Sequence, residues 1–145
     1  MKLVFKKISI ASDHAGYKLK CEIIKFLLKK NIQTIDMGPL NLKSVDYPDY
    51  AKKVANSIKP KKKEAGILIC GSGTGMAISA NKVKGIRAAL CYNKKSTYLS
   101  RLHNDANIIT IGSRFTNKKN ALLLIMLFLN TKFEGGRHLR RVKKI

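Results

Sequence analysis

The sequence has 145 residues, the size of one ordinary domain with a single sizeable core, and we expect residues 1–145 to form one domain. Its apolar runs are far shorter than the roughly 18 residues of a membrane span, and its first residues lack the apolar stretch of an export signal, so we expect neither feature. Three cysteines without C-x-x-C spacing argue against a disulfide framework or a zinc site and predict a reducing, cytoplasmic compartment.

The formal net charge of +22 would suit a nucleic-acid-binding protein, which is the alternative from another functional class. However, the lysines are spread along the chain, with one compact run at Lys59–Lys63, and the five tyrosines are not interleaved with them as stacking platforms. We therefore expect a solvated, repulsive surface and no specific nucleic-acid binding. The six arginines are better candidates for bidentate capture of phosphate.

Strand and helix patterns alternate in the first half of the chain. Lys7–Ala11 is a β-branched strand, and the helix after it, from about Tyr17 to Lys30, places apolar residues at a 3.6-residue period. A second strand is predicted at Ile32–Asp36. Pro48 can then open a helix that runs to about Ile58.

The second half continues the alternation around a central strand. The predicted elements are a strand at Ile67–Ile69, a helix at Met76–Ala80, a strand at Ile86–Cys91, a helix at Lys94–Leu102 capped by Asn93, a strand at Ile108–Ile111, and a helix at Ala121–Leu129 capped by Thr116 or Asn117. This order predicts a doubly wound, Rossmann-like α/β fold: a three-layer αβα sandwich with a five-stranded parallel sheet. The last helix is apolar all round, which predicts burial on more than one side, most simply in a subunit interface.

The stretch from Ala65 to Asn81, AGILICGSGTGMAISAN, predicts a buried strand, a glycine-rich loop and a helix N-terminus. Such a loop points several backbone N–H groups at one spot, which favours anionic oxygen. Cys70 ends the strand, where loop amides and the helix dipole can stabilise a thiolate. The spacing alone also suits a buried structural cysteine beside a simple turn, because it is neither a dinucleotide fingerprint nor a P-loop.

The expected neighbours of Cys70 follow from the fold, since doubly wound sheets bind ligands where the strand order reverses. Asp13 and His14 follow the first strand and Cys70 follows the third. A reversal between these two strands would place all three residues in one crevice.

Eight sequence blocks, in order and covering nearly the whole chain, resemble the type B ribose-5-phosphate isomerases. The blocks are SDHAGYKLK at 12–20, VDYPDYA at 45–51, GILICGSGTGM at 66–76, ANK at 80–82, GIRA at 85–88, SRLHNDAN at 100–107, IGSR at 111–114 and EGGRHLRRV at 134–142. The resemblance implies interconversion of ribose 5-phosphate and ribulose 5-phosphate through an enediolate, in the non-oxidative pentose phosphate pathway. The wider family includes galactose-6-phosphate and allose-6-phosphate isomerases, so a six-carbon sugar phosphate is the alternative substrate.

The resemblance also implies residue roles. Cys70 matches the base that moves a proton between C1 and C2, and His103 matches the group that opens the sugar ring. Another branch of the family has a glutamate at the position of Met76. The methionine side chain cannot accept a proton. The resemblance implies no cofactor and no metal.

Substrate contacts carry over to matched positions in the same way. They include three arginines, of which two lie in a basic tail at 133–145, and the amides of the glycine loop. The implied substrate-binding residues are Asp13, His14, Tyr47, Gly71, Ser72, Gly73, Thr74, Gly75, Asn104, Arg114, Arg137 and Arg141. For His138, a satisfied structural histidine remains the competing interpretation, and for Arg87, Arg101 and Arg140 the structural or solvated interpretation is favoured.

The assembly can be predicted from helix direction. A helix that starts at Lys94 runs against its strand and carries His103 about 13 Å away from the edge where Cys70 lies. The resemblance implies a homodimer, or else a tetramer, with sites at the interface. We therefore expect each active site to combine Cys70 of one subunit with His103 of another.

Overall fold

The strands of the computed structural model, which describes residues 3–59 and 62–145, form one sheet in the order β2-β1-β3-β5-β4. Every neighbouring pair is parallel. The strands are Lys7–Ser12 (β1), Ile35–Asp36 (β2), Glu64–Cys70 (β3), Ala88–Leu90 (β4) and Ile108–Gly112 (β5). The predicted five-stranded parallel sheet is confirmed.

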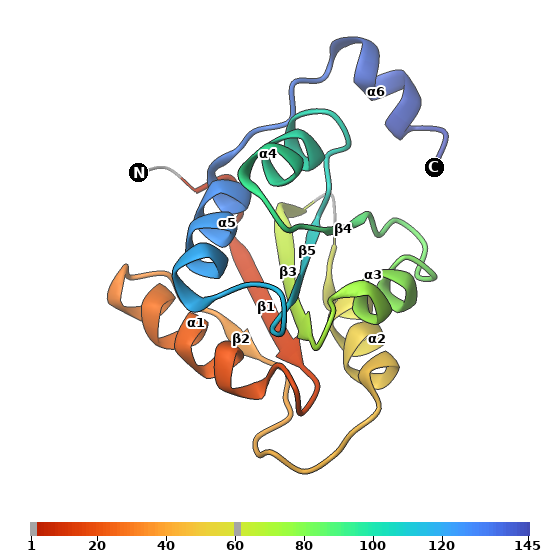
Figure 1. Cartoon of the computed structure of the whole chain (residues 1–145). Helices are drawn as coiled ribbons and strands as arrows, with labels where there is room; N and C mark the ends of the chain where they lie inside the picture. The colour runs from red at the N-terminus through yellow and green to blue at the C-terminus, as the bar shows by residue number, and fades with distance from the viewer. Residues whose placement is uncertain (1–2, 60–61) are drawn as a thin grey trace.

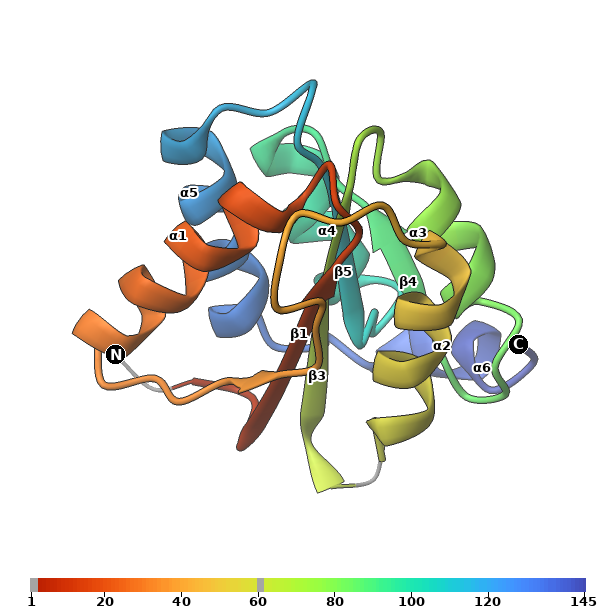
Figure 2. The ribbon, with the colours of Figure 1, turned by 90° about the horizontal axis from the view of Figure 1, so that it is seen from below.

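Helices cover both faces of this sheet (Figure 1). They are Tyr17–Lys29 (α1), Tyr47–Ser57 (α2), Thr74–Ala80 (α3), Lys94–Leu102 (α4), Lys118–Asn130 (α5) and Gly136–Val142 (α6). Figure 2 shows α1 and α5 on one side of the strands and α2 and α3 on the other. Because α1 leaves β1 toward one face and α3 leaves β3 toward the other, a crevice opens between the ends of these two adjacent strands.

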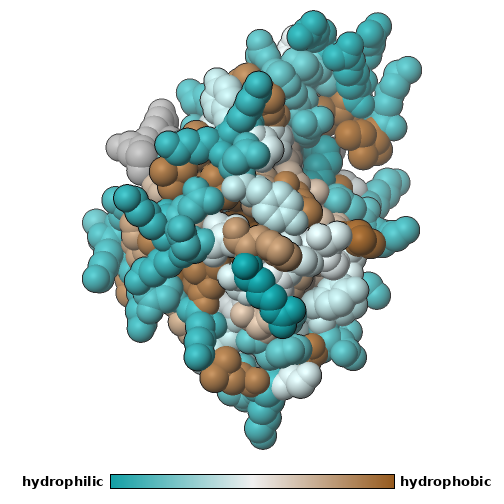
Figure 3. Space-filling view, in the orientation of Figure 1, coloured by the Kyte–Doolittle hydropathy of each residue, from teal (hydrophilic) through white to brown (hydrophobic). Residues whose placement is uncertain are grey.

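The surface is dominated by polar side chains. Hydrophilic residues occupy most of the outline of the face in Figure 3, with apolar side chains between them. The basic run Lys59–Lys63 includes residues 60 and 61, which lie outside the described residues. Among residues 3–59 and 62–145, none of the helices is both long enough and apolar enough to cross a bilayer.

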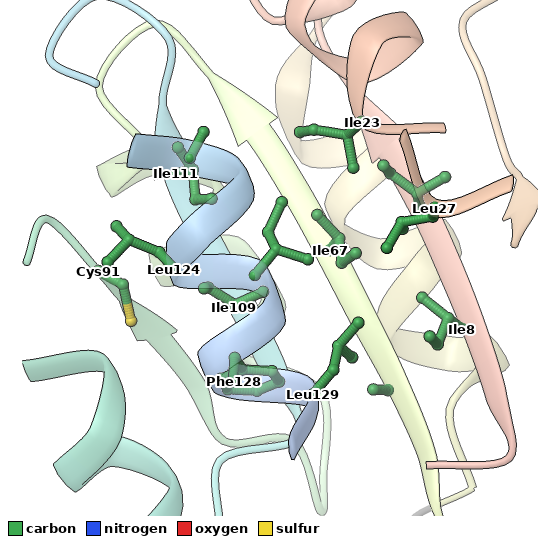
Figure 4. Packing of buried hydrophobic residues seen from close by; sticks show 14 of the residues in the cluster. Ile8, Ile23, Leu27, Ile67, Cys91, Ile109, Ile111, Leu124, Phe128 and Leu129 are labelled. Atoms are coloured by element: carbon green, nitrogen blue, oxygen red, sulfur yellow. The ribbon is translucent and has the colours of Figure 1, made fainter. Parts of the chain in front are cut away.

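Two apolar clusters fill the spaces between the layers, and β3 contributes to both. Ile67 and Ile69 face the cluster under α1 and α5, where they meet Ile109 and Phe128, as Figure 4 shows for several of these residues. Leu68 faces the other way, toward α2 and α3. All seven residues of β3 are buried, as predicted for a central parallel strand.

The strand predicted at Ile32–Asp36 is longer than the observed β2. The reason is that the start of the predicted strand belongs to the C-terminal cap of α1. Asn31 has a left-handed backbone (φ 58°), and the N–H of Ile32 donates to the Leu27 carbonyl at 2.9 Å. Together with the bond from the Asn31 N–H to the Leu28 carbonyl, this forms a Schellman motif. Ile32 is therefore part of a helix cap, and β2 keeps two residues.

The strand predicted at Ile86–Cys91 is also shorter, with β4 confined to Ala88–Leu90. The Arg87 N–H donates to the side chain of Asn107 rather than to a strand partner. The two predicted caps at Asn93 and Asn117 are confirmed, since each side-chain oxygen accepts an N–H bond at 2.9 Å from the first turn of its helix.

Helix α5 is covered on more than one side within the chain itself. Its buried residues face the sheet, while Arg101 of α4 lies over the ring of Phe128 at 5.6 Å. Leu123 is 36% exposed on the remaining side. Packing within the chain therefore accounts for most of the all-round apolar pattern, and an interface on this helix stays a prediction.

Candidate active site

A cavity of about 390 Å³ lies where β1, β3 and β5 end. It is lined by Asp13, Tyr47, Cys70, Gly71, Ser72, Gly75, Arg114 and Phe115. Segments from four separate parts of the sequence thus meet at the point where the strand order reverses. The expected crevice contains Asp13 and Cys70, but His14, which was expected beside them, does not line it.

Cys70 is held at the base of this cavity by the chain on both sides of it. Its carbonyl accepts a 2.8 Å hydrogen bond from the N–H of Ser113, which follows β5. The N–H of Gly73 donates to its sulfur at 3.1 Å. This backbone donor fixes the sulfur against the start of the glycine loop.

The loop after Cys70 needs its glycines because other groups lie against the backbone. Gly73 has φ +79°, and a Cβ there would lie 2.8 Å from the carbonyl carbon of Ile111. A Cβ on Gly75 would lie 2.6 Å from the Tyr47 ring. The aromatic ring therefore rests directly on the loop and forms one wall of the cavity.

Arg114 supplies the positive charge of the cavity. Its backbone N–H donates to the Gly71 carbonyl at 3.0 Å. Its guanidinium lies next to Gly71, because a Cβ on Gly71 would be only 3.0 Å from Nη1. The next residue, Phe115, also lines the cavity although it is 70% exposed. Phe115 is not among the site residues predicted from the sequence, and the available signal was its position directly after the arginine at the end of β5.

Asp13 and His14 lie at the end of β1. Asp13 is 7% exposed, and its carboxylate accepts a 2.9 Å bond from the N–H of Gly16, so it also fixes the start of α1. His14 does not line the cavity, and its Nδ1 accepts a bond from the Val45 N–H at 3.3 Å. That bond leaves a neutral His14 ring with its proton on Nε2, which can donate.

Ser72 of the loop lines the cavity. The N–H of Thr74 donates to the Ser72 hydroxyl oxygen at 3.2 Å, and Thr74 begins α3. The structure thus brings seven of the predicted residues to the lining of one cavity: Asp13, Tyr47, Cys70, Gly71, Ser72, Gly75 and Arg114. The other predicted residues do not line this cavity: His14, Gly73, Thr74, His103, Asn104, Arg137 and Arg141.

His103 caps the C-terminal end of α4, which in a parallel α/β sheet lies at the opposite edge from the strand ends. Asn104 lines a different cavity, beside Ile145. The loop that follows α4 is held by two arginines. Arg87 donates to the Asn104 carbonyl, and Arg101, which is 2% exposed, donates to the Asp105 carboxylate at 2.9 Å. The structural interpretation of these two arginines is confirmed.

The basic tail leads away from the Cys70 cavity. Arg137 and Arg141 are exposed and four residues apart on α6, which projects from the body next to the end of α4 (Figure 1). His138 is buried on the same helix, and its ring stacks on that of His103 with centroids 4.1 Å apart. One subunit therefore carries two separate groups of the predicted site residues.

Comparison with known proteins gives matches along nearly the full length. Residues 8–145 match the Ribose/Galactose Isomerase family. The chain is 42% identical to ribose-5-phosphate isomerase B of Escherichia coli over 140 residues, which is 97% of this chain and 94% of that protein. The structure of the Clostridium thermocellum ribose-5-phosphate isomerase B is similar with a TM-score of 0.92 and 49% identity, over 96% of this chain and 94% of that one.

A further similar structure is that of Mycoplasma genitalium ribose-5-phosphate isomerase B with bound ribulose 5-phosphate. Its TM-score is 0.93 at 43% identity, and the match covers 99% of this chain and 95% of that chain. Fold and sequence thus agree over the region that contains both groups of site residues. The chain belongs to the ribose/galactose isomerase family.

Proposed function

We propose that this protein interconverts ribose 5-phosphate and ribulose 5-phosphate through an enediolate, as a step of the non-oxidative pentose phosphate pathway. The observation that carries the proposal is the Cys70 thiol at the base of a cavity, with a backbone N–H aimed at its sulfur and an arginine beside it. The reaction needs a base beside two carbons, donors for two oxygens and a cation for the phosphate. These groups stand together at the ends of β3 and β5.

In the proton transfer, the Cys70 thiolate removes the proton from C2 of the open-chain aldose and returns it to C1, while the proton of the O2 hydroxyl passes to O1. Met76, at the corresponding position of the glutamate in the other branch, is buried and has no acidic proton to exchange. The loop amides stabilise the negative charge that develops on the substrate oxygens. Because these donors belong to a tightly packed loop, they need little rearrangement as the charge develops.

The phosphate and hydroxyl groups of the sugar require separate contacts. Arg114 presents a planar cation at the cavity mouth, which suits bidentate binding of phosphate. Asp13 accepts hydrogen bonds from sugar hydroxyls, and His14 donates from Nε2. The Tyr47 ring closes the wall beside Gly75 and limits the depth of the pocket.

The ring-opening step requires a second group of residues. His103 acts as its acid, Asn104 binds next to it, and Arg137 and Arg141 contribute to phosphate binding. Because these residues lie at the other edge of the subunit, we propose a homodimer in which each site combines the Cys70 cavity of one subunit with the His103 edge of the other. Two-fold symmetry then forms two equivalent sites.

The three cysteines, all free thiols in the structure, suit a reducing compartment, and we infer a cytoplasmic location. A coupled assay that compares ribose 5-phosphate with allose 6-phosphate and galactose 6-phosphate tests the substrate. We expect ribose 5-phosphate to have the highest kcat/KM. Preference for either six-carbon sugar would change the substrate but keep the reaction, whereas turnover of none of the three would overturn the proposal.

A further inference from the structure

A second cluster of titratable side chains lies where the C-terminal tail crosses the end of α4. The Arg101 side chain donates to the Thr131 carbonyl at 3.2 Å, and the N–H of Glu134 donates to the Leu102 carbonyl at 3.0 Å. These two bonds hold the tail against α4 just before α6 begins. The Glu134 side chain is thereby carried to the end of α4, where His103 lies.

The Glu134 carboxylate faces two histidines at once. Its Oε2 is 3.7 Å from Nε2 of His103 and 3.5 Å from Nε2 of His138. The two rings stack with centroids 4.1 Å apart and planes inclined by 13°. These distances are long for hydrogen bonds, but they are short for the interaction of a carboxylate with a charged ring.

The stack determines where a proton can be held. Two imidazolium rings in contact would repel each other, so the pair favours a single proton. Burial lowers the pKa of His138, and the charges of His103, Arg137 and Arg141 lower it further, while Glu134 opposes them. The side chain of His103 is 33% exposed and that of His138 is 9% exposed, so His103 is the better position for the proton.

The same three residues have the ligand types of a metal site, and their ligand atoms lie within 4.8 Å of one another. The stacked arrangement does not suit an ion. Ring contact keeps the two planes roughly 3.5 Å apart. An ion in the plane of one ring at the usual ~2.0–2.1 Å would therefore lie far out of the plane of the other. The arrangement instead suits one shared proton beside a carboxylate.

We propose that Glu134 and His138 are positioning residues that keep His103 protonated and correctly oriented for ring opening. The inference rests on the proposed function, in which His103 is the ring-opening acid. The negative charge of Glu134 stabilises the protonated His103 ring. The flat, neutral ring of His138 fixes the plane of His103 and leaves the proton on it.

The ring-opening step balances with water as the only other participant. The His103 proton moves to the ring oxygen as the bond from that oxygen to C1 breaks. The proton of the C1 hydroxyl leaves to water as the C1 carbonyl forms, and water then returns a proton to His103. Loss of Glu134 or His138 should therefore slow the opening of the ring and leave the later chemistry at Cys70 intact.

The first test is Glu134→Gln, which keeps the shape and removes the charge. We expect kcat for ribose 5-phosphate to fall by roughly 10-fold, which is less than the loss of about 10²–10⁴ expected for removal of the acid in His103→Ala. The high-pH limb of kcat/KM should also move to lower pH, because a protonated His103 is no longer stabilised by the carboxylate. Glu22→Gln is the matched control, since Glu22 is an exposed acid paired with Lys118 elsewhere on the surface.

A second pair of variants separates stacking from structure. His138→Phe retains a flat ring against His103, whereas His138→Ala removes it. We expect His138→Phe to keep most of the ribose 5-phosphate turnover and His138→Ala to lose it to about the same extent as Glu134→Gln. Equal loss in both His138 variants would overturn the role given to the stack.

The decisive readout bypasses ring opening. Ribulose 5-phosphate cannot form a ring through its phosphorylated O5, so exchange of its C1 hydrogen with D₂O reports only the proton transfer at Cys70. Glu134→Gln should retain near-wild-type exchange while it loses aldose turnover. Equal loss of both activities, or unchanged aldose kinetics and pH profile, would overturn the inference; wild-type protein that neither exchanges this hydrogen nor isomerises would overturn the proposed function instead.

Discussion

The Cys70 cavity and the His103 edge are constructed in different ways. Around Cys70, the strand ends and loops are joined by backbone hydrogen bonds, and a Cβ on Gly73 or Gly75 would approach its neighbours closer than 3.0 Å. At the other edge, a Cβ added to Gly135 or Gly136 would meet nothing within 4 Å, and α6 projects outward (Figure 1). The first region is defined by the packing of the chain around it, while the backbone of the second is open to the space around the glycines.

Removal of the base from the packed region should have the largest effect on activity. Cys70→Ala should lower kcat by at least about 10³-fold and leave sugar-phosphate binding within a few-fold, because the thiolate acts in the transition state while the arginines bind the ground state. Turnover by the coupled assay and binding by calorimetry measure the two effects. Cys21→Ala, in α1, is the control and should retain activity.

A Cys70→Ala protein with near-wild-type kcat would make Cys70 a packing residue. The distinction is sharp because the alanine keeps the small volume of the site, so a loss of activity with unchanged thermal stability cannot be attributed to unfolding. A stability loss of more than about 2 kcal/mol would instead indicate a structural role for the thiol.

The second prediction joins the two regions across a subunit boundary. Cys70→Ala and His103→Ala proteins should each be nearly inactive, and mixing them under conditions of subunit exchange should restore about a quarter of wild-type activity. Half of the randomly exchanged dimers are mixed, and each of these has one intact site and one doubly damaged site. Native mass spectrometry counts the mixed dimers, and their presence without any recovered activity would contradict the shared site.

How far the sequence predicted these regions depends on how local each one is. The Cys70 strand and its glycine loop are contiguous, so their pattern was sufficient to place the thiol beside the loop amides. The contact of His103 with His138 joins residues 35 positions apart through the path of the tail, and no local pattern encodes that path. Phe115 was missed because an exposed aromatic after a strand has the same pattern as an ordinary surface residue.

Errors in the strands have a similar cause. The β-branched residues at 32–36 predicted a longer β2, but Asn31 formed a left-handed cap that committed Ile32 to α1. Asn31 itself indicates a helix cap, because asparagine adopts the left-handed backbone more readily than most residues. Whether the cap outweighs the strand propensity of the residues after it depends on the burial of Ile32.

The third prediction compares two glycines that both have positive φ. Gly73→Ala places a Cβ against the backbone of β5, so the loop must shift; we expect a loss of roughly 1–3 kcal/mol in stability and about 10-fold in kcat. In Gly136→Ala the Cβ meets open space and only the φ of +52° is strained, so the stability loss should be about 1 kcal/mol, with kcat within about three-fold. Urea unfolding and steady-state kinetics measure both variants, and an equal effect at the two positions would remove the distinction between the packed and the open region.

The smallest expected effect concerns the charge that surrounds both regions. The net charge of +22 comes mainly from lysines distributed over the chain rather than gathered at either group of site residues. Binding to duplex DNA should therefore be weak, similar for unrelated sequences and nearly absent at moderate salt, because a contact with 6–10 phosphates loses roughly 10³–10⁵ in affinity between about 50 and 200 mM salt. Isomerase activity should persist over this range, with a modest rise in KM as salt anions compete for the cations that bind phosphate.

Fluorescence anisotropy with two unrelated duplexes, measured beside the coupled assay at each salt concentration, follows both quantities in one protein preparation. Sequence-selective DNA binding that survives about 200 mM salt would mean that the lysine surface is a recognition site, and the basic composition would then need a functional explanation separate from the isomerase.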